Sequence, residues 1–600
     1  MKISSDNTWT IENINTGDIY LTKINPNGTG SLSLNRKSDS TIGTNSVALG
    51  IDSTASGNYS MTEGKQTTAS GEAAHAEGVS TTASKVGAHA EGGSTKASGN
   101  YSHAEGYSTT ASGTYSHAEG AYSTSSGAYS HAEGSYTKVT TSASSTPLLS
   151  SSTTGGQYGH AEGYGTVSYG LASHAEGNGT SAKGVASHSE GRSTVASGDY
   201  SHTEGSDTTA SGNAAHAEGA GNIASGDCSH AEGKKTTASG LHSHAEGNST
   251  TVTNDDTITA TTTNSLEAGY YGHAEGYGTV SYGAASHAEG NGTMASGANS
   301  HAEGYKTTSS ADYSHAEGYN ATASGEGAHA EGSWCVASGD PSHAEGQSTV
   351  ASGWGSHSEG RATMSFGVAS HSEGYSAEVV INELTENSNS QTIINLWETK
   401  KFGLATGQGA HSEGVNTLSF GNGSHSEGRR TWAMECSHAE GTDTIAYGGY
   451  SHAEGDSTLG YGYASHAEGS GGGSIITVTG SANATQYTVN DTTSIKVGRV
   501  IRYKNNFALI TAVNGTTITV NETLSSTALN SASAEVFLLV SSGVASHAEG
   551  SETIASGNYS HASGYSTIAL DNQFVIGHYN STSTGAAATS SGVGTGSTTN

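Results

Sequence analysis

Ser102-His103-Ala104-Glu105-Gly106 is one copy of a phrase that recurs through most of this 600-residue chain. Of the 29 histidines, 27 occupy the place of His103 in the phrase, and most follow the previous one by 14 residues. A short fixed period is typical of repeat proteins, in which each repeat packs only on its neighbours. The sequence therefore predicts a solenoid with coils of about 14 residues.

The small residues of each coil indicate which face points inward. Ala104 and Ala111 lie seven residues apart, half a coil, which predicts two short strands per coil joined by turns that contain Gly. Side chains alternate between the two faces of a strand. We therefore expect Ala104 to point into a thin roll, and His103 and Glu105 to point away from it.

Composition and charge exclude several classes of protein. Hydrophobic residues make up 32% of the chain and Gly 86 of its residues, which would allow disorder, but a disordered chain has no reason to keep a strict period. The net charge of −32 disfavours nucleic acid and anionic membranes as partners. No run of 18 apolar residues predicts membrane insertion, and the first residues lack the apolar region of a secretory signal.

The three cysteines, Cys228, Cys335 and Cys436, are about six coils apart from one to the next once insertions are discounted. That separation is too large for a disulfide bond. We expect three free thiols, and the spacing matches no zinc motif.

The repeat and its interruptions divide the chain. Residues 1–45 carry no repeat and predict an N-terminal β cap or attachment segment. The roll is expected over 46–472 and 543–578, with loop insertions near 139–156, 252–268 and 377–407; the third of these suits a projecting hairpin. Residues 473–542 predict an inserted small β-barrel or sandwich, and residues 579–600 a flexible tail of Ser, Thr and Gly.

Within 473–542 we expect five strands, each marked by a run of apolar residues. Asn514-Gly515 is a strong signal for a hairpin turn between two of them. The predicted strands are Ile475–Val478, Val500–Tyr503, Ala508–Ile510, Thr517–Val520 and Val536–Val540.

The near-invariance of His and Glu indicates that both face something repetitive. A solvent-facing position should vary, as the position seven residues after the histidine does in Thr110, Val195 and Met294. A thin roll with an Ala interior also buries too little apolar area to be stable alone. Further copies of the same chain around a common axis are the natural partner.

Asn45-Ser46-Val47-Ala48-Leu49-Gly50 and the 14-residue frame resemble the head repeats of trimeric autotransporter adhesins, the YadA-like head. The resemblance implies an all-β, left-handed parallel β-roll that forms a homotrimer, with the alternating residues of the motif at the trimer interface. His and Glu replace the two apolar residues of the motif in nearly every coil. The interface residues implied are Val47, Leu49, Met61, Glu63, His75, Glu77, His103, Glu105, His174, Glu176, His301, Glu303, His343, Glu345, His452, Glu454, His547 and Glu549.

The His-Ala-Glu-Gly form of the repeat also resembles bacteriophage tail or head fibre proteins. With no membrane anchor or secretion signal seen, this resemblance implies a virion structural protein: a rigid shaft, made in the host cytoplasm and attached to other virion proteins by its N-terminal segment. Its decorations would bind a host-surface polysaccharide. The alternative is the stalk of a bacterial surface trimeric adhesin.

An enzyme is not expected, because a catalytic site is singular whereas this pair recurs in almost every coil. A less favoured third hypothesis is a glycan depolymerase, for which Glu383 and Glu386 in the third insertion are the local candidates. The tyrosines that precede the phrase, such as Tyr101 and Tyr115, could stack on sugars, but such residues more often cover the edge of a roll.

The trimer hypothesis predicts that His of one chain bonds Glu of the next in stacked rings. Such a Glu would raise the pKa of its His and lower its own, and the shaft would be most stable in mildly acidic to neutral solution. Rings of His could instead bind divalent cations, but hydrogen bonding is the favoured interpretation, so no metal or cofactor is expected.

Overall fold

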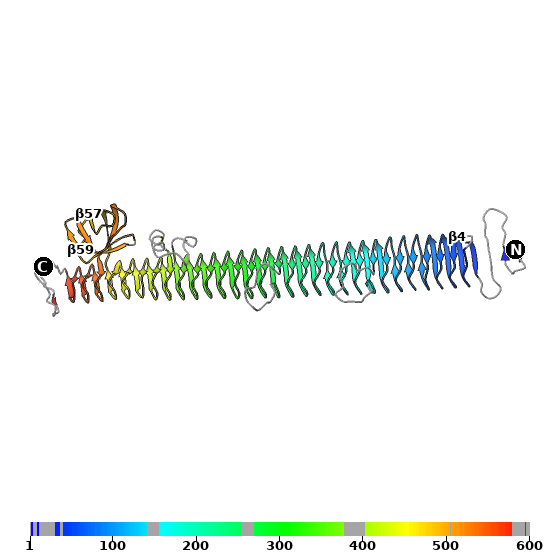
Figure 1. The fold of residues 1–600 in the computed structure, drawn as a ribbon, viewed down its shortest axis with the longest axis horizontal. Helices are drawn as coiled ribbons and strands as arrows, with labels where there is room; N and C mark the ends of the chain where they lie inside the picture. Colours follow the sequence, from blue (N-terminus) through cyan, green and yellow to red (C-terminus); the bar gives the residue numbers. More distant parts are fainter. Residues whose placement is uncertain are drawn as a thin grey trace. The chain divides into compact units, whose positions relative to one another are not determined.

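The computed structural model describes residues 2–3, 9–10, 31–36, 40–140, 155–253, 269–376, 396, 402–504, 506–578 and 594–595. The chain divides into two compact units, Met1–Gly292 and Thr293–Asn600. Both units are all-β and consist mainly of parallel strands stacked coil on coil (Figure 1). The predicted β-solenoid with coils of about 14 residues is confirmed.

Each coil contributes one strand to each of two faces. The first-face strand begins at the repeating histidine, and the second-face strand begins seven residues later. For example, β11 (His103–Ala104) pairs in parallel with β13 (His117–Ala118), and β12 (Thr110–Ala111) pairs with β14 (Thr124–Ser125). The register advances by one 14-residue coil at each step, so equivalent residues lie side by side.

In Met1–Gly292, β4 (Val47–Ala55) spans both faces at the start of the roll. The second-face strands run from β6 (Thr68–Ala69) to β32 (Val280–Ser281). The first-face strands are β5 (Met61–Lys65), β7 (His75–Val79), β9 (His89–Ala90), β11, β13, β15 (His131–Ser135), β17 (His160–Tyr164), β19 (His174–Asn178), β21 (His188–Ser189), β23 (His202–Thr203), β25 (His216–Ala220), β27 (His230–Lys234), β29 (His244–Asn248), β31 (His273–Tyr277) and β33 (His287–Asn291).

In Thr293–Asn600, the second-face strands run from β34 (Met294–Ala295) to β66 (Ile568–Ala569). The first-face strands are β35 (His301–Tyr305), β37 (His315–Tyr319), β39 (His329–Ser333), β41 (His343–Gln347), β43 (His357–Arg361), β45 (His371–Tyr375), β47 (His411–Val415), β49 (His425–Arg429), β51 (His438–Thr442), β53 (His452–Asp456), β55 (His466–Ser470), β63 (His547–Ser551), β65 (His561–Tyr565) and β67 (Phe574–His578).

The interior of the roll is a column of small side chains. Ala104 and Ala111 are fully buried, as are their equivalents in neighbouring coils. The hydroxyl of Ser102 is also buried, and it donates a hydrogen bond to the Gly99 carbonyl at 2.8 Å. The backbone carbonyl satisfies this hydroxyl, so a small polar group such as that of Ser102 can be buried in the interior. The predicted inward direction of the small residues is confirmed.

Each coil turns twice, and each turn contains a residue with left-handed backbone, such as Tyr101 (φ 54°) and Ser108 (φ 55°). Between them, Gly106 has φ 100°, and a Cβ added there would lie 2.1 Å from the carbonyl oxygen of Gly120 in the next coil. Only glycine allows the two coils to approach this closely. This contact explains the glycine that ends every phrase.

The first insertion leaves the stacking of coils intact. Strand β15 pairs directly with β17, with His131 opposite His160, although residues 141–154 separate the two coils in the sequence. The three predicted loop insertions lie mostly outside the described residues. The hairpin expected near 377–407 also falls largely in this part of the chain.

The fourth insertion forms a closed antiparallel barrel, in which β57 and β59 are labelled in Figure 1. Its order is β56 (Gly473–Gly480), β57 (Gln486–Val489), β60 (Thr517–Val520), β59 (Asn506–Asn514), β58 (Val500–Tyr503) and β61 (Leu529–Phe537). Asn514 pairs with Thr517 across the expected hairpin turn. Strand β57 was not predicted, and the expected strand Val536–Val540 is divided: β61 ends at Phe537, and β62 (Leu539–Ser541) belongs to the roll.

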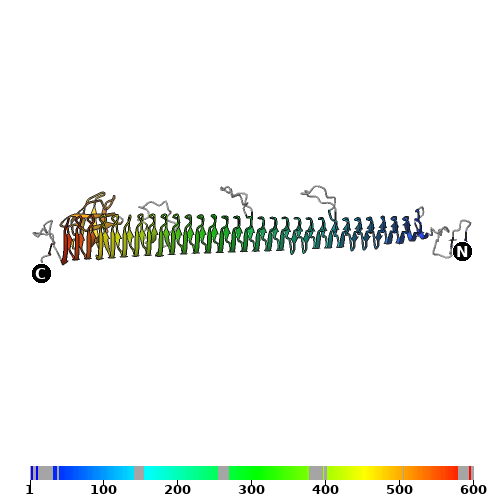
Figure 2. The same cartoon turned by 90° about the horizontal axis from the view of Figure 1, so that it is seen from below.

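The barrel packs on the second face of the roll in its own unit (Figure 2). Trp432 and Leu418 of the roll join Phe507 and Phe537 of the barrel in one buried apolar cluster. Beyond the barrel the roll resumes, since β55 pairs with β63 with His466 opposite His547. The barrel is therefore inserted between two coils that remain neighbours.

Near the N-terminus, β1 (Lys2–Ile3) and β2 (Trp9–Thr10) form an antiparallel pair, and β3 (Leu32–Arg36) pairs in parallel with β4. The three cysteines are free thiols, as predicted: Cys335 is buried, and Cys228 and Cys436 are exposed. Within the described ranges, no helix has the length and apolar character needed to cross a membrane.

Candidate functional site

The repeating histidines and the glutamates two residues after them form a ladder on the first face of the roll, called here the His–Glu ladder. His103 and Glu105 flank the fully buried Ala104 on strand β11 and its extension. The His103 and Glu105 side chains keep 34% and 33% of their surface exposed. The period of two thus points both functional side chains outward, as predicted, and leaves them half-buried against equivalent residues of adjacent coils.

The histidine rings of the ladder stack on one another. Ring centroids of His89 and His103 are 4.7 Å apart with an interplanar angle of 1°, and those of His103 and His117 are also 4.7 Å apart. This spacing equals the distance between neighbouring strands of a sheet. The coil repeat therefore dictates the stacking, and it continues across the barrel insertion, where His466 and His547 are 4.4 Å apart.

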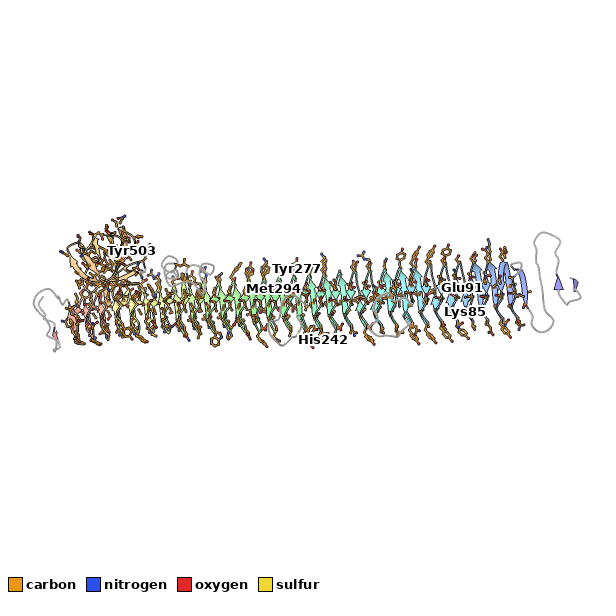
Figure 3. The ribbon with its side chains drawn as sticks, viewed as in Figure 1. Lys85, Glu91, His242, Tyr277, Met294 and Tyr503 are labelled. Atoms are coloured by element: carbon orange, nitrogen blue, oxygen red, sulfur yellow. The ribbon has the colours of Figure 1, made fainter. Side chains whose placement is uncertain are left out.

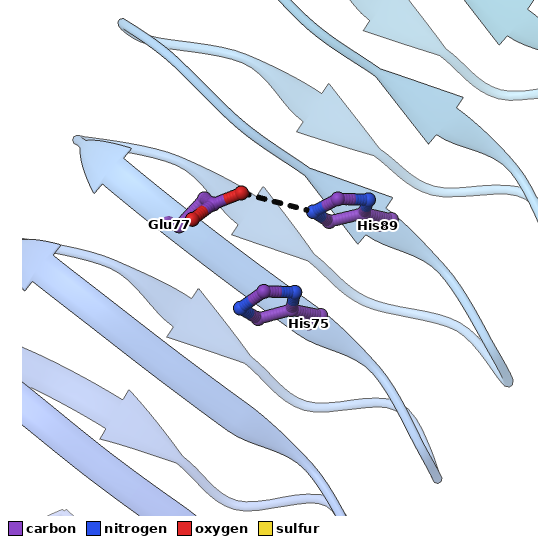
Figure 4. Close-up of side chains that lie close together, drawn as sticks. All are labelled: His75, Glu77 and His89. Atoms are coloured by element: carbon purple, nitrogen blue, oxygen red, sulfur yellow. Dashed lines mark ion pairs between the residues drawn. The ribbon is translucent and has the colours of Figure 1, made fainter.

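Each ladder glutamate lies close to histidines of one or two coils. A carboxylate oxygen of Glu77 is 3.4 Å from Nε2 of His89 in the next coil (Figure 4). Nε2 of His103 lies 3.5 Å from Glu91 and 3.8 Å from Glu105. Ordinary N–H···O hydrogen bonds measure about 2.7–3.2 Å. Within one chain, the ladder thus places imidazole and carboxylate groups close together, but the distances between them are longer than those of an ordinary hydrogen bond.

The histidine Nε2 atoms face this space without a hydrogen bond. In the described part of the chain, the Nε2 atoms of His75, His103 and His117 are buried and have no hydrogen-bond partner. Burial of an unsatisfied polar atom is costly. Its recurrence along the ladder indicates that the first face is incomplete in the isolated chain.

The carboxylates form a second row beside the rings. Glu77, Glu91 and Glu105 line a groove of about 490 Å³ whose floor is made by glycines such as Gly92 and Gly106. Hydrogen bonds with Glu105 and Glu77 raise the pKa of Glu91 to about 7, and the same contacts lower the pKa of both neighbours. Near neutral pH Glu91 is therefore readily protonated, and a proton there relieves the repulsion of like charges one coil apart.

Within one chain, glutamate raises the pKa of histidine as expected, but other effects outweigh it; the pairing of His and Glu between chains stays a prediction. Burial lowers the pKa of His103, and the neighbouring His117 and His89 lower it further, against the raising effect of Glu105. The pKa of His371 falls to about 4 for the same reason. Stacked imidazoles remove water from one another and repel each other's charge, so the ladder favours neutral histidine.

The predicted interface residues all lie on the first face of their units and are half-buried there. Val47 pairs with Met61, and Met61 with His75, so apolar residues and histidine occupy one position of the coil. Leu49, Glu63 and Glu77 likewise share the position two residues later. Their role at a trimer interface stays a prediction.

Consecutive coils bring together groups with the chemistry of metal ligands. His75, Glu77 and His89 offer ligand atoms that all lie within 4.8 Å of one another, and the same arrangement recurs along the ladder. Imidazole nitrogen and carboxylate oxygen together suit divalent transition metals. These residues could hold a cation in addition to, or in place of, contacts with another chain.

The tyrosines form rows at the edges of the roll and are not part of the His–Glu ladder. Tyr101, Tyr115 and Tyr129 stack with centroids 5.1 Å apart and interplanar angles of 8° and 12°. Their faces are turned to one another, which favours the interpretation that they cover the edge. Figure 3 shows His242, which is not part of the ladder, and Tyr277 at opposite edges of the same unit.

The sequence analysis missed the surface on which the barrel packs. In the position of Thr110, where many other coils carry Thr, Lys or Val that is not fully buried, these coils carry buried apolar residues: Met364, Leu404, Leu418, Trp432, Ile445 and Leu459. That change of residue type was the available signal. The depolymerase candidates Glu383 and Glu386 lie outside the described residues.

The comparisons agree with the geometry of the coil. The family model described as the YadA head domain repeat, with two copies, matches residues 42–61, 104–130, 316–333 and 548–570. No curated protein matches the chain. The matched segments lie in the roll of both units and outside the barrel. These four segments of the roll are therefore YadA-like head repeats.

Proposed function

We propose that this chain is the stalk of a trimeric, adhesin-like surface fibre, with three copies meeting along their His–Glu ladders. The YadA-like family is structural, without enzymatic activity, and forms homotrimers. The match to its head repeat supports this function, which the sequence analysis held as the alternative.

The observation that carries the proposal is the incompleteness of the first face. Its ladder side chains keep about a third of their surface exposed, while the Nε2 atoms of His75, His103 and His117 are buried and have no hydrogen-bond partner among the described residues. In Thr293–Asn600, the barrel packs on the second face instead. Copies of the same chain can approach the first face and supply the missing partners.

The bacteriophage fibre has no support in the family match, which names only the adhesin repeat. Location on a virion and attachment to virion proteins therefore stay predictions. We propose a position on an extracellular surface. Binding of a host polysaccharide is the corresponding proposal for the ligand.

The experiment combines mass and cross-linking. Light scattering at neutral pH should give about three times the 60.1 kDa mass of the chain. In a background with the three natural cysteines changed to serine, Glu105→Cys should form disulfide-linked chains on oxidation, because equivalent residues meet at the axis. Thr110→Cys, on the second face of the same coil, is the matched control and should stay monomeric on a denaturing gel.

A monomeric mass would refute the trimer. A trimeric mass with cross-linking of Thr110→Cys and none of Glu105→Cys would place the second face at the axis, and the role of the ladder would be wrong.

A further inference from the structure

We infer that the His–Glu ladder is a repeated binding site for divalent transition-metal ions, each held by imidazole and carboxylate groups of adjacent coils within one chain. The ligands would be Nε2 of a ladder histidine and an oxygen of a glutamate in the adjacent coil, as in His89 and Glu77. Because one chain supplies these atoms, the inference does not depend on the trimer.

The distances between ligand atoms carry the argument. Two ligands of a tetrahedral zinc ion, at bond lengths of about 2.0–2.2 Å, lie about 3.3–3.5 Å apart. The Nε2–oxygen separations are 3.4 Å for His89 and Glu77, 3.5 Å for His103 and Glu91, and 3.6 Å for His131 and Glu119. These values suit two ligands of one ion better than the two ends of a hydrogen bond.

The Nε2 atoms provide an independent observation. Those of His75, His103 and His117 are buried and make no hydrogen bond to any described residue. A neutral imidazole with its proton on Nδ1 presents a lone pair at Nε2, which is the form that binds metals. The ladder thus repeats an imidazole nitrogen that can bind a metal ion, and this nitrogen lies beside a carboxylate in each case.

The negative charge of the ladder also favours a divalent cation as the bound ion. The carboxylates of Glu77, Glu91 and Glu105 line one groove, one coil apart, in a chain of net charge −32. Divalent cations would neutralise this row, and the imidazole ligands select zinc-like ions over Mg²⁺, which prefers oxygen ligands alone. The vacant coordination positions would be taken by water or by groups of another chain.

The test uses the full chain, freed of metal with EDTA and then dialysed against Zn²⁺ at neutral pH. Elemental analysis should find several zinc ions per chain, whereas Mg²⁺ under the same conditions should not be retained. X-ray absorption should show nitrogen and oxygen ligands at about 2.0–2.1 Å with the outer-shell scattering of imidazole. Less than one zinc ion per chain, or a spectrum without imidazole, would overturn the inference.

Two block variants locate the ions. The position accepts apolar side chains, as Val47 shows, so a His-block variant should keep its fold, which circular dichroism would check. It removes five of the 27 repeating histidines and should lower zinc uptake by about one fifth. The His-block variant is His75→Val, His89→Val, His103→Val, His117→Val and His131→Val.

The Glu-block variant changes the paired glutamates to glutamine, which keeps their size, and should lower zinc uptake to a similar extent. Its substitutions are Glu77→Gln, Glu91→Gln, Glu105→Gln, Glu119→Gln and Glu133→Gln. His242→Phe is the control, because His242 lies at a turn and stacks on Tyr271 rather than on the ladder. Equal uptake by wild type and both block variants would show that the ions bind elsewhere. Light scattering in EDTA separates failure of the metal site from failure of the trimer.

Discussion

Trp432 of the roll meets Phe507 of the inserted barrel edge to face, with ring centroids 5.5 Å apart and an interplanar angle of 60°. Trp432 is fully buried at this contact. It pairs with Leu418 and Ile445 of the two neighbouring coils, so a run of large apolar residues at this position of the repeat forms the surface that holds the barrel.

Replacing Trp432 with alanine should loosen the barrel. A buried Trp→Ala change costs about 3–5 kcal/mol, and here the loss falls on the contact between barrel and roll. Hydrogen exchange of peptides from β56 to β61 should become faster, with little change in distant coils, because repeat proteins lose stability locally. Trp354→Ala is the control: that side chain is 62% exposed, and its exchange pattern should stay as in wild type.

Gly106→Ala should disrupt the stacking of two coils. The new Cβ would lie 2.1 Å from the Gly120 carbonyl oxygen at φ 100°, and strain of this kind costs about 2–3 kcal/mol or more. Calorimetry should show a clearly lower melting temperature. Gly165→Ala has φ 65° but nothing within 4 Å of its Cβ, so it should cost only about 1–2 kcal/mol. Equal effects of the two changes would contradict this explanation.

Stability should fall on the acid side of neutrality because of the histidines. The folded-state pKa of His371 and His466 is about 4, against an ordinary value of 6.5. The unfolded chain therefore binds protons more readily, and stability that is complete above pH 6.5 is lost as the pH falls towards 4. Melting temperatures measured in EDTA should show this decline, and the His-block variant should show a smaller one.

The glutamates should act in the opposite direction. The folded-state pKa of Glu91 and Glu119 is about 7, against an ordinary value of 4.5. Their contribution is complete below pH 4.5 and is lost as the pH rises through 7. We expect the highest melting temperature near pH 6, and a weaker alkaline decline in the Glu-block variant. A melting temperature independent of pH between 4 and 9 would contradict both assignments.

Arg499 and Glu552 should respond unequally to substitution. Arg499 is 1% exposed; one of its nitrogens donates to the Ser494 carbonyl at 2.6 Å, and another lies 3.8 Å from Glu552. Burial lowers the pKa of Arg499 to about 10. Glu552→Gln leaves a buried charge uncompensated and should cost about 3 kcal/mol, whereas Arg499→Met replaces the charge by an apolar chain and should cost less. Denaturant unfolding of the two variants would check this order, and a larger loss for Arg499→Met would reverse it.

Much of the coil could be predicted from the sequence. The spacing of His103 and His117 indicated the 14-residue coil, and the alternation of Ser102, Ala104 and Glu105 indicated which side chains face inward. Both follow from the geometry of a strand, in which neighbouring residues point to opposite faces. The barrel was predicted in outline, but β57 was missed because Gln486–Val489 has only two apolar residues.

The sequence by itself determined the repeat, the inward face and the outward position of His and Glu, because these depend only on periods along the chain. The tertiary structure decided what the ladder does electrostatically. It stacks His89 on His103 at 4.7 Å and holds Glu77 3.4 Å from His89. These distances connect different coils, so burial and the repulsion of like charges between coils, which no spacing along the sequence reveals, set the pKa of each group.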